Sequence, residues 1–166
     1  MLLMKKIIFV ILSIFQTLAV SAQSKSFDLL LRSMIKKTVP IIKVQELKAQ
    51  KGRVVLLDAR ERREFEVSHL RDARYVGFND FSIESIKDIS KSSPIVVYCS
   101  IGVRSEKIGE KLLAAGYTNV RNCYGSIFEW VNQGNEVVDM QDKPTTKIHA
   151  YNQKWGVWVK KGERVY

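Results

Sequence analysis

The segment YCSIGVRS, residues 98–105, places a thiol, a glycine and an arginine within one short loop. Cys99 follows an apolar run, and the residues after the loop have the periodicity of a helix over residues 105–115. A thiol near a helix N-terminus ionises more readily, because the free N–H groups there favour the thiolate. Arg104 adds a permanent positive charge, and Gly102 lets the backbone curl so that several N–H groups face one point. This pattern predicts a nucleophilic sulfur whose adduct is held by main-chain donors.

The surrounding pattern places this loop at the carboxyl end of a buried strand. Short apolar runs alternate with helical segments, and the unbroken runs VVLL and PIVVY are typical of strands buried on both faces. Such alternation indicates an α/β protein with a mostly parallel sheet, whose ligands bind at the carboxyl ends of the strands. The predicted strands cover residues 39–42, 54–57, 73–76, 94–98 and 120–123. The predicted helices cover residues 26–37, 44–50, 60–67, 81–89, 105–115 and 127–133.

The loop CSIGVRS resembles the active-site loop of rhodaneses, the sulfurtransferase family, which often reads C-x-x-G-x-R-S. Three further landmarks are similar and follow in the family's order. LLDARERREFEVSHL (56–70) resembles L-D-x-R-x-x-x-E-(F/Y)-x-x-G-H-I, Asp72 and Ala73 stand where the family has Gly-Ala, and NCYGSIFEWVNQG (122–134) resembles N-L-x-G-G-x-x-x-W-x-x-x-G. The resemblance covers residues 39–138 and implies a doubly wound, mostly parallel five-stranded sheet with helices on both faces.

The resemblance also implies sulfur transfer through a covalent intermediate. The Cys99 thiolate would attack the outer sulfur of a small anionic donor such as thiosulfate, and a thiol or cyanide would then take the sulfur from the Cys99 persulfide. Cys99 and Arg104 are the catalytic residues in this interpretation, which requires no organic cofactor and no metal. The substrate-binding residues are those of the loop, Ser100, Ile101, Gly102, Val103 and Ser105.

The spacing from Cys99 to Arg104, C-x4-R, differs from that of tyrosine phosphatases, which use C-x5-R. The longer ring of N–H groups can surround a phosphoryl group, whereas the shorter one resembles the ring that holds a single transferred sulfur. The sequence therefore favours sulfur transfer over phosphate hydrolysis.

Residues outside the loop are expected to shape the site. Asp58 and Arg60 are expected to pair within it, and His69 occupies the family's histidine position, where we expect a bond to the backbone. Glu64 follows Arg60 by four residues, the spacing of an ion pair on a helical turn. Trp130 is expected in the core.

Cys123 has two interpretations. It stands where the family has an apolar residue, so in the first it is a small buried hydrophobe. In the second, neighbouring strands bring it within disulfide range of Cys99, and the two thiols form a redox switch or Cys123 resolves the persulfide. With two cysteines, no CxxC pair and no His/Cys cluster, the chain predicts neither a disulfide scaffold nor a structural metal site.

The chain departs from the family pattern at several positions. Ser68, Asp72 and Ser126 replace glycines, which affects turns. The loop interior carries no basic residue, so a thiosulfate dianion would depend on Arg104, the helix end and charges outside the loop.

Residues 1–22 have the features of a signal peptide, with Lys5 and Lys6, an apolar run and a small-residue cleavage site ending at Ala22. The apolar run is shorter than the roughly 20 residues that a membrane span needs. We therefore expect export to the periplasm or medium, with no stable membrane span after cleavage; an uncleaved anchor is the alternative. Cleavage lowers the net charge from +10 to +8. Because the basic residues are scattered, we expect solvated surface and no nucleic-acid partner.

The expected organisation is a signal peptide (1–22), a helical lead-in (23–38), a rhodanese-like domain (39–139) and a C-terminal extension (140–166). With 46% apolar and 27% charged residues, the composition is that of one globular domain. Aromatic residues of the extension are expected to cover apolar surface or to roof the active site. The expected function is that of a sulfurtransferase; the alternative is a non-catalytic module of the same fold that binds a partner or carries persulfide sulfur.

Overall fold

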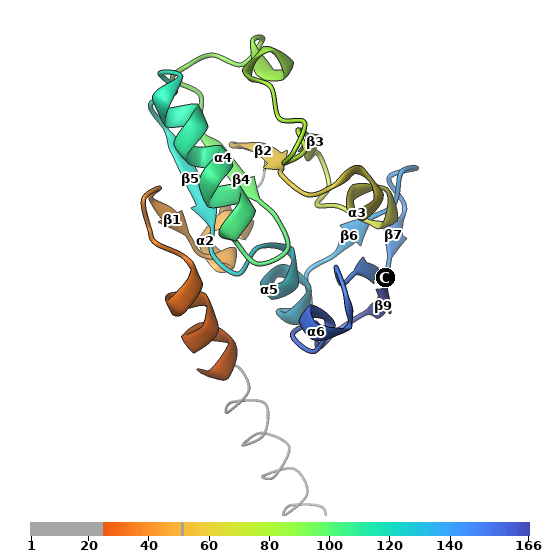
Figure 1. Cartoon of the computed structure of the whole chain (residues 1–166). Helices are drawn as coiled ribbons and strands as arrows, with labels where there is room; N and C mark the ends of the chain where they lie inside the picture. Colours follow the sequence, from red (N-terminus) through yellow and green to blue (C-terminus); the bar gives the residue numbers. More distant parts are fainter. Residues whose placement is uncertain (1–24, 51) are drawn as a thin grey trace, which may run out of the picture. The chain divides into compact units, whose positions relative to one another are not determined.

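The computed structural model describes residues 25–50 and 52–166 (Figure 1). The predicted signal peptide lies outside these residues and stays a prediction. The chain divides into two compact units, and the boundary between them lies between Met34 and Ile35. In the first unit residues 25–34 form a helix, as the sequence predicted for this region. Nowhere in the described ranges is a helix both long and apolar enough to span a bilayer.

The second unit is built on a parallel five-stranded sheet with the strand order β1-β5-β4-β2-β3 (Figure 1). Every pair of neighbours in this sheet runs parallel, which confirms the predicted α/β fold. The strands are β1 (Ile41–Ile42), β2 (Val55–Asp58), β3 (Arg74–Tyr75), β4 (Ile95–Tyr98) and β5 (Val120–Cys123). The helical segments are α2 (Val44–Ala49), α3 (Arg62–Val67), the 3₁₀ helix η1 (Ile83–Ile86), α4 (Val103–Ala114) and α5 (Ser126–Asn132).

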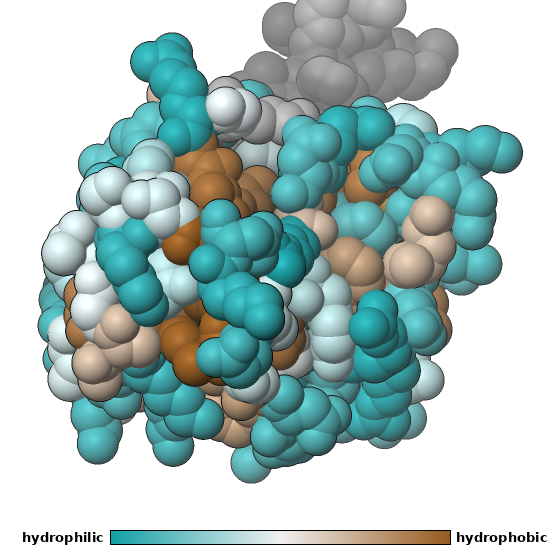
Figure 2. Space-filling model, turned by 90° about the horizontal axis from the view of Figure 1, so that it is seen from above, coloured by the Kyte–Doolittle hydropathy of each residue, from teal (hydrophilic) through white to brown (hydrophobic). Residues whose placement is uncertain are grey.

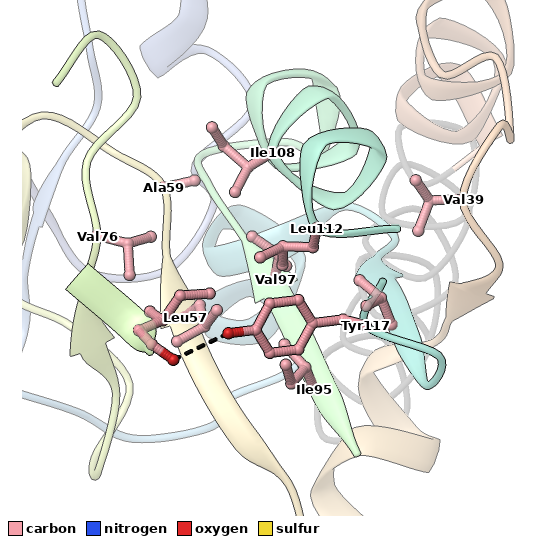
Figure 3. Packing of buried hydrophobic residues seen from close by; sticks show 11 residues of the cluster. Val39, Leu57, Ala59, Val76, Ile95, Val97, Ile108, Leu112 and Tyr117 are labelled. Carbon is pink, nitrogen blue, oxygen red and sulfur yellow. Dashed lines mark hydrogen bonds between the residues drawn. The ribbon is translucent and has the colours of Figure 1, made fainter. Parts of the chain in front are cut away.

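The face of the sheet under α4 carries the main core. Successive side chains of a strand point to opposite faces, and α4 packs on β4 and β5. Figure 3 shows the resulting layer, in which the Tyr117 hydroxyl donates to the Ile86 carbonyl at 2.9 Å. The buried residues of this layer are Val39, Leu57, Ala59, Val76, Ile86, Ile95, Val97, Ile108, Leu112, Tyr117 and Val120.

The opposite face of the sheet is covered by α2 and α5, which contact each other. Leu56 of β2 lines a small cavity together with Leu47 of α2 and Trp130 of α5. Trp130 is 6% exposed, which confirms its predicted place in the core. The sheet is therefore held rigid from both sides, and its strand ends have fixed positions.

The start of α4 differs from the prediction. The helix begins at Val103 instead of Ser105, so Arg104 lies in its first turn. Its N-cap is Gly102, with a left-handed φ of 118° and no capping side chain. Because Gly102 provides no capping side chain, no cap residue in the sequence marks this earlier start.

The C-terminal extension adds two small sheets beside α3 (Figure 1). The antiparallel pair of β6 (Val137–Val138) and β7 (Pro144–Thr145) crosses the predicted domain boundary at residue 139. The parallel strands β8 (Lys147–His149) and β9 (Glu163–Val165) enclose α6 (Gln153–Gly156). Because β8 contacts α3, the extension is packed against the segment that follows β2.

Hydrophilic side chains cover most of the face that Figure 2 shows, and apolar groups are visible only in gaps between them. The expectation that much of the charge is solvated surface stays a prediction.

The layer under α4 can be tested with two adjacent leucines. Leu112→Ala is expected to lower the free energy of unfolding by about 3 kcal/mol, because its side chain is fully buried and leaves a cavity. Leu113→Ala makes the same change one residue along, at a partly buried position, and is expected to cost about half as much or less. Urea unfolding of both variants measures the difference, and equal losses would contradict the described packing.

Candidate active site

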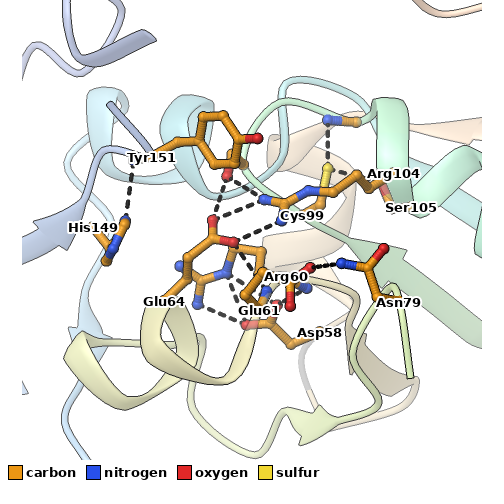
Figure 4. A network of polar contacts seen from close by, with 12 residues as sticks. Asp58, Arg60, Glu61, Glu64, Asn79, Cys99, Arg104, Ser105, His149 and Tyr151 are labelled. Carbon is orange, nitrogen blue, oxygen red and sulfur yellow. Dashed lines mark hydrogen bonds and ion pairs between the residues drawn. The ribbon is translucent and has the colours of Figure 1, made fainter. Parts of the chain in front are cut away.

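Cys99 follows β4 directly, and its sulfur faces hydrogen-bond donors from the next turn (Figure 4). Its Sγ accepts from the Gly102 N–H at 3.1 Å and from the Ser105 hydroxyl at 3.5 Å, and the Ser105 N–H also contacts it. The carbonyls of Cys99 and Ser100 accept from N–H groups in the first turn of α5, at 3.2 and 3.1 Å. Since those carbonyls are engaged elsewhere, the loop presents donors to the sulfur, which suits an anion.

Gly102 is required by the shape of this loop. Its φ of 118° lies in the left-handed region, and an added Cβ would lie 2.8 Å from Cδ1 of Ile35 and 3.4 Å from the carbonyl of Cys123. Asn122 secures the turn by donating to the Gly102 carbonyl at 2.9 Å and accepting from Ser105 Oγ at 2.7 Å. The end of β5 thereby fixes the curl that aims the Gly102 N–H at the sulfur.

Arg104 is paired with Glu64 of α3. Nη1 and Nη2 of the arginine donate to the two carboxylate oxygens at 2.6 and 2.8 Å, and Ser100 Oγ contacts both partners at 2.9 Å. Burial acts to raise the pKa of Glu64, but the hydrogen bonds and charge of Arg104 outweigh it and lower this pKa to about 2. Glu64 is therefore an anion at neutral pH, and it pairs with the arginine that the sequence assigned to anion binding.

The predicted pair of Glu64 with Arg60 is wrong, whereas the predicted pair of Arg60 with Asp58 is confirmed. Arg60 Nη2 donates to Asp58 Oδ2 at 2.7 Å, and both side chains are fully buried. The same Nη2 donates to the Ser68 carbonyl at 2.6 Å. This pair ties the end of β2 to the chain that leaves α3, and it holds α3 where Glu64 reaches Arg104.

His69 binds the backbone, as predicted. Its Nδ1 lies 3.0 Å from the Phe65 carbonyl, and because a carbonyl can only accept, Nδ1 carries the proton. The ring stacks on Phe65 with centroids 4.0 Å apart, and the His69 backbone exchanges hydrogen bonds with Val138 at 2.9 Å. His69 thus links α3 to β6, and its role in shaping the site stays a prediction.

The two cysteines differ in character although each is 1% exposed. Burial acts to raise the pKa of Cys99, but the Arg104 charge and the Ser105 and Gly102 donors outweigh it, so this pKa is lowered. Burial raises the pKa of Cys123 to about 12, which keeps its thiol protonated and weakly nucleophilic at neutral pH. Both thiols are free in the structure. Cys123 thus has the buried, apolar character of the first interpretation, and the redox pairing stays a prediction.

The sequence did not predict the roles of two polar residues in the site, Asn122 and Ser126. The Ser126 Oγ accepts a hydrogen bond from the Cys99 N–H at 3.0 Å and donates one to the Cys123 carbonyl at 2.9 Å. Ser126 has a left-handed φ of 49°, where the family pattern has glycine. That departure was visible in the sequence, but the hydroxyl's partners were not.

The extension reaches this site through Tyr151. The Arg104 guanidinium carbon lies 5.3 Å from the centre of the Tyr151 ring, and Figure 4 shows the ring beside the Arg104–Glu64 pair. Cys99 is 1% exposed, while the Arg104 side chain is 17% exposed. The sulfur-bearing residue is therefore almost fully covered in this structure, and Arg104 is the more exposed of the two.

These features define an α/β protein with an ionisable cysteine in a ring of main-chain donors at the carboxyl end of its sheet. Residues 43–133 match the family of the rhodanese-like domain, and the chain belongs to this family.

Several characterised proteins are similar to parts of the chain. A tRNA uridine(34) hydroxylase of Cytophaga hutchinsonii is 33% identical over 109 residues, which are 61% of this chain and 35% of the hydroxylase. The adenylyltransferase and sulfurtransferase UBA4 of Candida albicans is 32% identical over 87 residues, which are 48% of this chain and 20% of that protein. The chain thus spans about a third or less of the length of these relatives.

Solved structures share the fold. A thiosulfate sulfurtransferase of Pseudomonas aeruginosa superposes with a TM-score of 0.58 at 20% identity, covering 82% of this chain and 26% of that one. A rhodanese-like domain of an Anabaena protein superposes with a TM-score of 0.57 at 21% identity, covering 61% of this chain and 80% of that one. Both confirm the rhodanese-like fold of the sheet and its helices.

The contrast between the two thiols can be measured by alkylation. We expect iodoacetamide to modify Cys99 with a pH midpoint below that of an ordinary cysteine, because the thiolate is stabilised by Arg104, Ser105 and Gly102. Ser105→Ala removes one donor and should move the midpoint upward, whereas Cys123→Ser should leave it unchanged. Mass spectrometry of the peptides across a pH series provides the rates, and a midpoint unmoved by Ser105→Ala would contradict the described contacts.

Proposed function

We propose that this chain transfers sulfane sulfur through a persulfide on Cys99. The observation that carries the proposal is the set of donors from Gly102 and Ser105 around a sulfur whose pKa is lowered. Such an arrangement stabilises a thiolate before the reaction and a persulfide anion after it.

In the first step the Cys99 thiolate attacks the sulfane sulfur of the donor. A bond forms between Sγ and that sulfur, the bond from that sulfur to the rest of the donor breaks, and the leaving group departs with the electron pair. In the second step a thiolate or cyanide attacks the outer sulfur of the persulfide, and Cys99 leaves as the thiolate. The electrons balance in both steps without an external oxidant or reductant, so Cys99 ends each cycle as it began.

The neighbouring residues position this chemistry. The Gly102 N–H points at Sγ because Asn122 holds the Gly102 carbonyl. Ser105 donates from the first turn of α4, where the helix end also favours negative charge. The sulfurtransferase named among the relatives supports the same reaction class. The chain matches only 35% of the tRNA hydroxylase, so hydroxylation is not part of the proposed function.

The proposed acceptor is a small thiol or cyanide, and the proposed place of action is outside the cytoplasm. The location rests on the signal-like residues 1–22. We also propose that the processed chain has no stable membrane span and no nucleic-acid partner.

The covalent intermediate can be weighed directly. The intact protein, treated with a sulfane-sulfur donor and desalted without reductant, should gain the mass of one sulfur atom, and cyanide should remove it. Cys99→Ser should gain none, while Cys123→Ser, a matched change at the other thiol, should gain it as the wild type does. Sulfur gained equally by Cys99→Ser and the wild type would exclude the proposal.

Processing of the N-terminus has its own test. The full chain expressed in a bacterium with its first 22 residues intact should be recovered from the periplasm or medium with Gln23 as its first residue. N-terminal sequencing of the purified protein identifies this end. An unprocessed N-terminus in the membrane fraction would instead support the anchor.

A further inference from the structure

The C-terminal extension forms a concave site of its own. An open groove of about 570 Å³ is lined by residues of α5, β6, β7 and β8 and of the turn before β9. This volume lies within the range of about 300–1,000 Å³ that small-molecule sites occupy. All lining residues except Val131 follow residue 133, where the match to the rhodanese-like domain ends. The groove therefore belongs to what this chain adds to the family domain.

The groove and the reactive cysteine lie on opposite sides of β8. Successive side chains of a strand point to opposite faces, and Ile148 lines the groove. His149, the next residue, lies on the other face, where its Nδ1 accepts from the N–H of Tyr151, the residue that stacks on Arg104 (Figure 4). A ligand in the groove therefore does not contact the sulfur of Cys99.

The floor of the groove is apolar and made of core residues. Val131, Val137 and Ile148 line it, although they are only 5%, 2% and 1% exposed. Because the interior holds these side chains in place, the floor keeps its shape without a ligand. Asn135 and Thr145 add polar groups to the lining. An apolar floor with a few polar groups is typical of a preformed small-molecule site.

Three cations gather at the groove. Lys161 lines it directly. Arg164 of β9 is in register with Ile148 of β8, so the two side chains lie on the same face of this strand pair. Lys160 lies close to Arg164, since its pKa is lowered by burial and then by the positive charge of Arg164. Neighbouring cations of this kind attract an anion.

The nearby carboxylates leave these cations unpaired. None of the three makes an ion pair with another described residue. Glu136 also lines the groove, but its Oε1 accepts from Arg71 at 3.1 Å. Glu163 precedes Arg164 in β9 and so points to the other face of the strand. The rim of the groove therefore carries a net positive charge.

The backbone positions Lys161 at this rim. Gly162, the next residue, has a left-handed φ of 97°, and an added Cβ would lie 2.6 Å from the Thr146 carbonyl oxygen. The turn before β9 is therefore closed tightly against the start of β8. At Gly134 an added Cβ would lie 3.2 Å from the Lys161 Nζ, so the missing side chain leaves room for the ammonium group at the end of α5.

We propose that this groove is a second binding site, which takes a small organic anion. The apolar body of the ligand lies on Val131, Val137 and Ile148. Its carboxylate, sulfonate or phosphate group lies at Lys161 and Arg164. The concave shape favours a free small molecule over the surface of a bilayer. This site goes beyond the proposed sulfur transfer and does not depend on it.

Two fluorescent probes separate the head group from the body. Anilinonaphthalene sulfonate combines an apolar body with one sulfonate, and N-phenylnaphthylamine has the same body without the charge. Titration of the full chain should show saturable binding of the sulfonate, about tenfold or more tighter than that of the neutral amine. Equal affinities for the two probes would overturn the proposal.

Lys161→Gln tests the charge at the rim. The variant should bind the sulfonate about threefold or more weakly and the neutral amine as the wild type does. Lys48→Gln, which removes an exposed lysine from α2, is the matched control and should change neither affinity. Residues 1–22 are identical in all these chains, so probe bound there cancels in the comparison. Equal effects of Lys161→Gln and Lys48→Gln would overturn the proposal.

Thr146→Trp tests the location of the body. Thr146 lines the groove and is exposed, so a large side chain there should occupy the groove and weaken the binding of both probes. Urea unfolding of the variant shows whether it is folded. A folded variant that binds both probes as the wild type does would overturn the placement in the groove.

Two further outcomes distinguish this site from its rivals. The sulfonate probe should bind Cys99→Ser as tightly as the wild type, and a saturating amount of it should not prevent persulfide formation on Cys99. Loss of the probe in Cys99→Ser would place it at the active site and overturn the second site, while leaving the proposed sulfur transfer standing. Sedimentation with phosphatidylglycerol vesicles that Lys161→Gln abolishes, without binding of the free sulfonate, would overturn it in favour of a lipid surface.

Discussion

The hydrogen bond from the Gly102 N–H to the sulfur of Cys99 is the contact on which the rest of the site depends. An anion buried at 1% exposure is costly unless donors replace the water it loses. Glycine is favoured at this point because the φ of 118° is strained for any residue with a Cβ, and a Cβ would also displace the terminal methyl group of Ile35. The sheet, the hydrogen bonds of Asn122 and the start of α5 all keep the Gly102 N–H pointing at the sulfur.

Charge around the site is balanced by separate pairs. Asp58 with Arg60 and Glu64 with Arg104 each join a buried carboxylate to a guanidinium in a two-pronged contact. Buried charges are tolerated only when paired with good geometry. The first pair fixes the turn after β2, and the second joins α3 to α4, so neither acts as a free cation. The site therefore stabilises its sulfur with the nearby charge of Arg104 together with the oriented donors of Ser105 and Gly102.

Much of the fold could be predicted because the apolar runs of β2 and β4 are long enough to indicate buried parallel strands. Cys99, Gly102 and Arg104 were predictable because their order is local. The partner of Arg104 was not: Glu64 lies 40 residues away in sequence, and its spacing from Arg60 offered an equally good local pair. The contact of Tyr151 with Arg104 was harder still to predict, because the short strands of the extension have no periodicity that relates them to the sheet.

The hydroxyl of Ser126 explains how a turn that favours glycine can carry a side chain. A left-handed φ costs a serine about 1 kcal/mol or more, and a hydrogen bond to a buried N–H returns about 1 kcal/mol. Ser126 bridges the Cys99 N–H and the Cys123 carbonyl, so the two terms nearly offset each other. Serine and glycine are therefore expected to give similar folding free energies at this turn. What such an exchange alters is how firmly the ends of β4 and β5 are joined beneath the reactive sulfur.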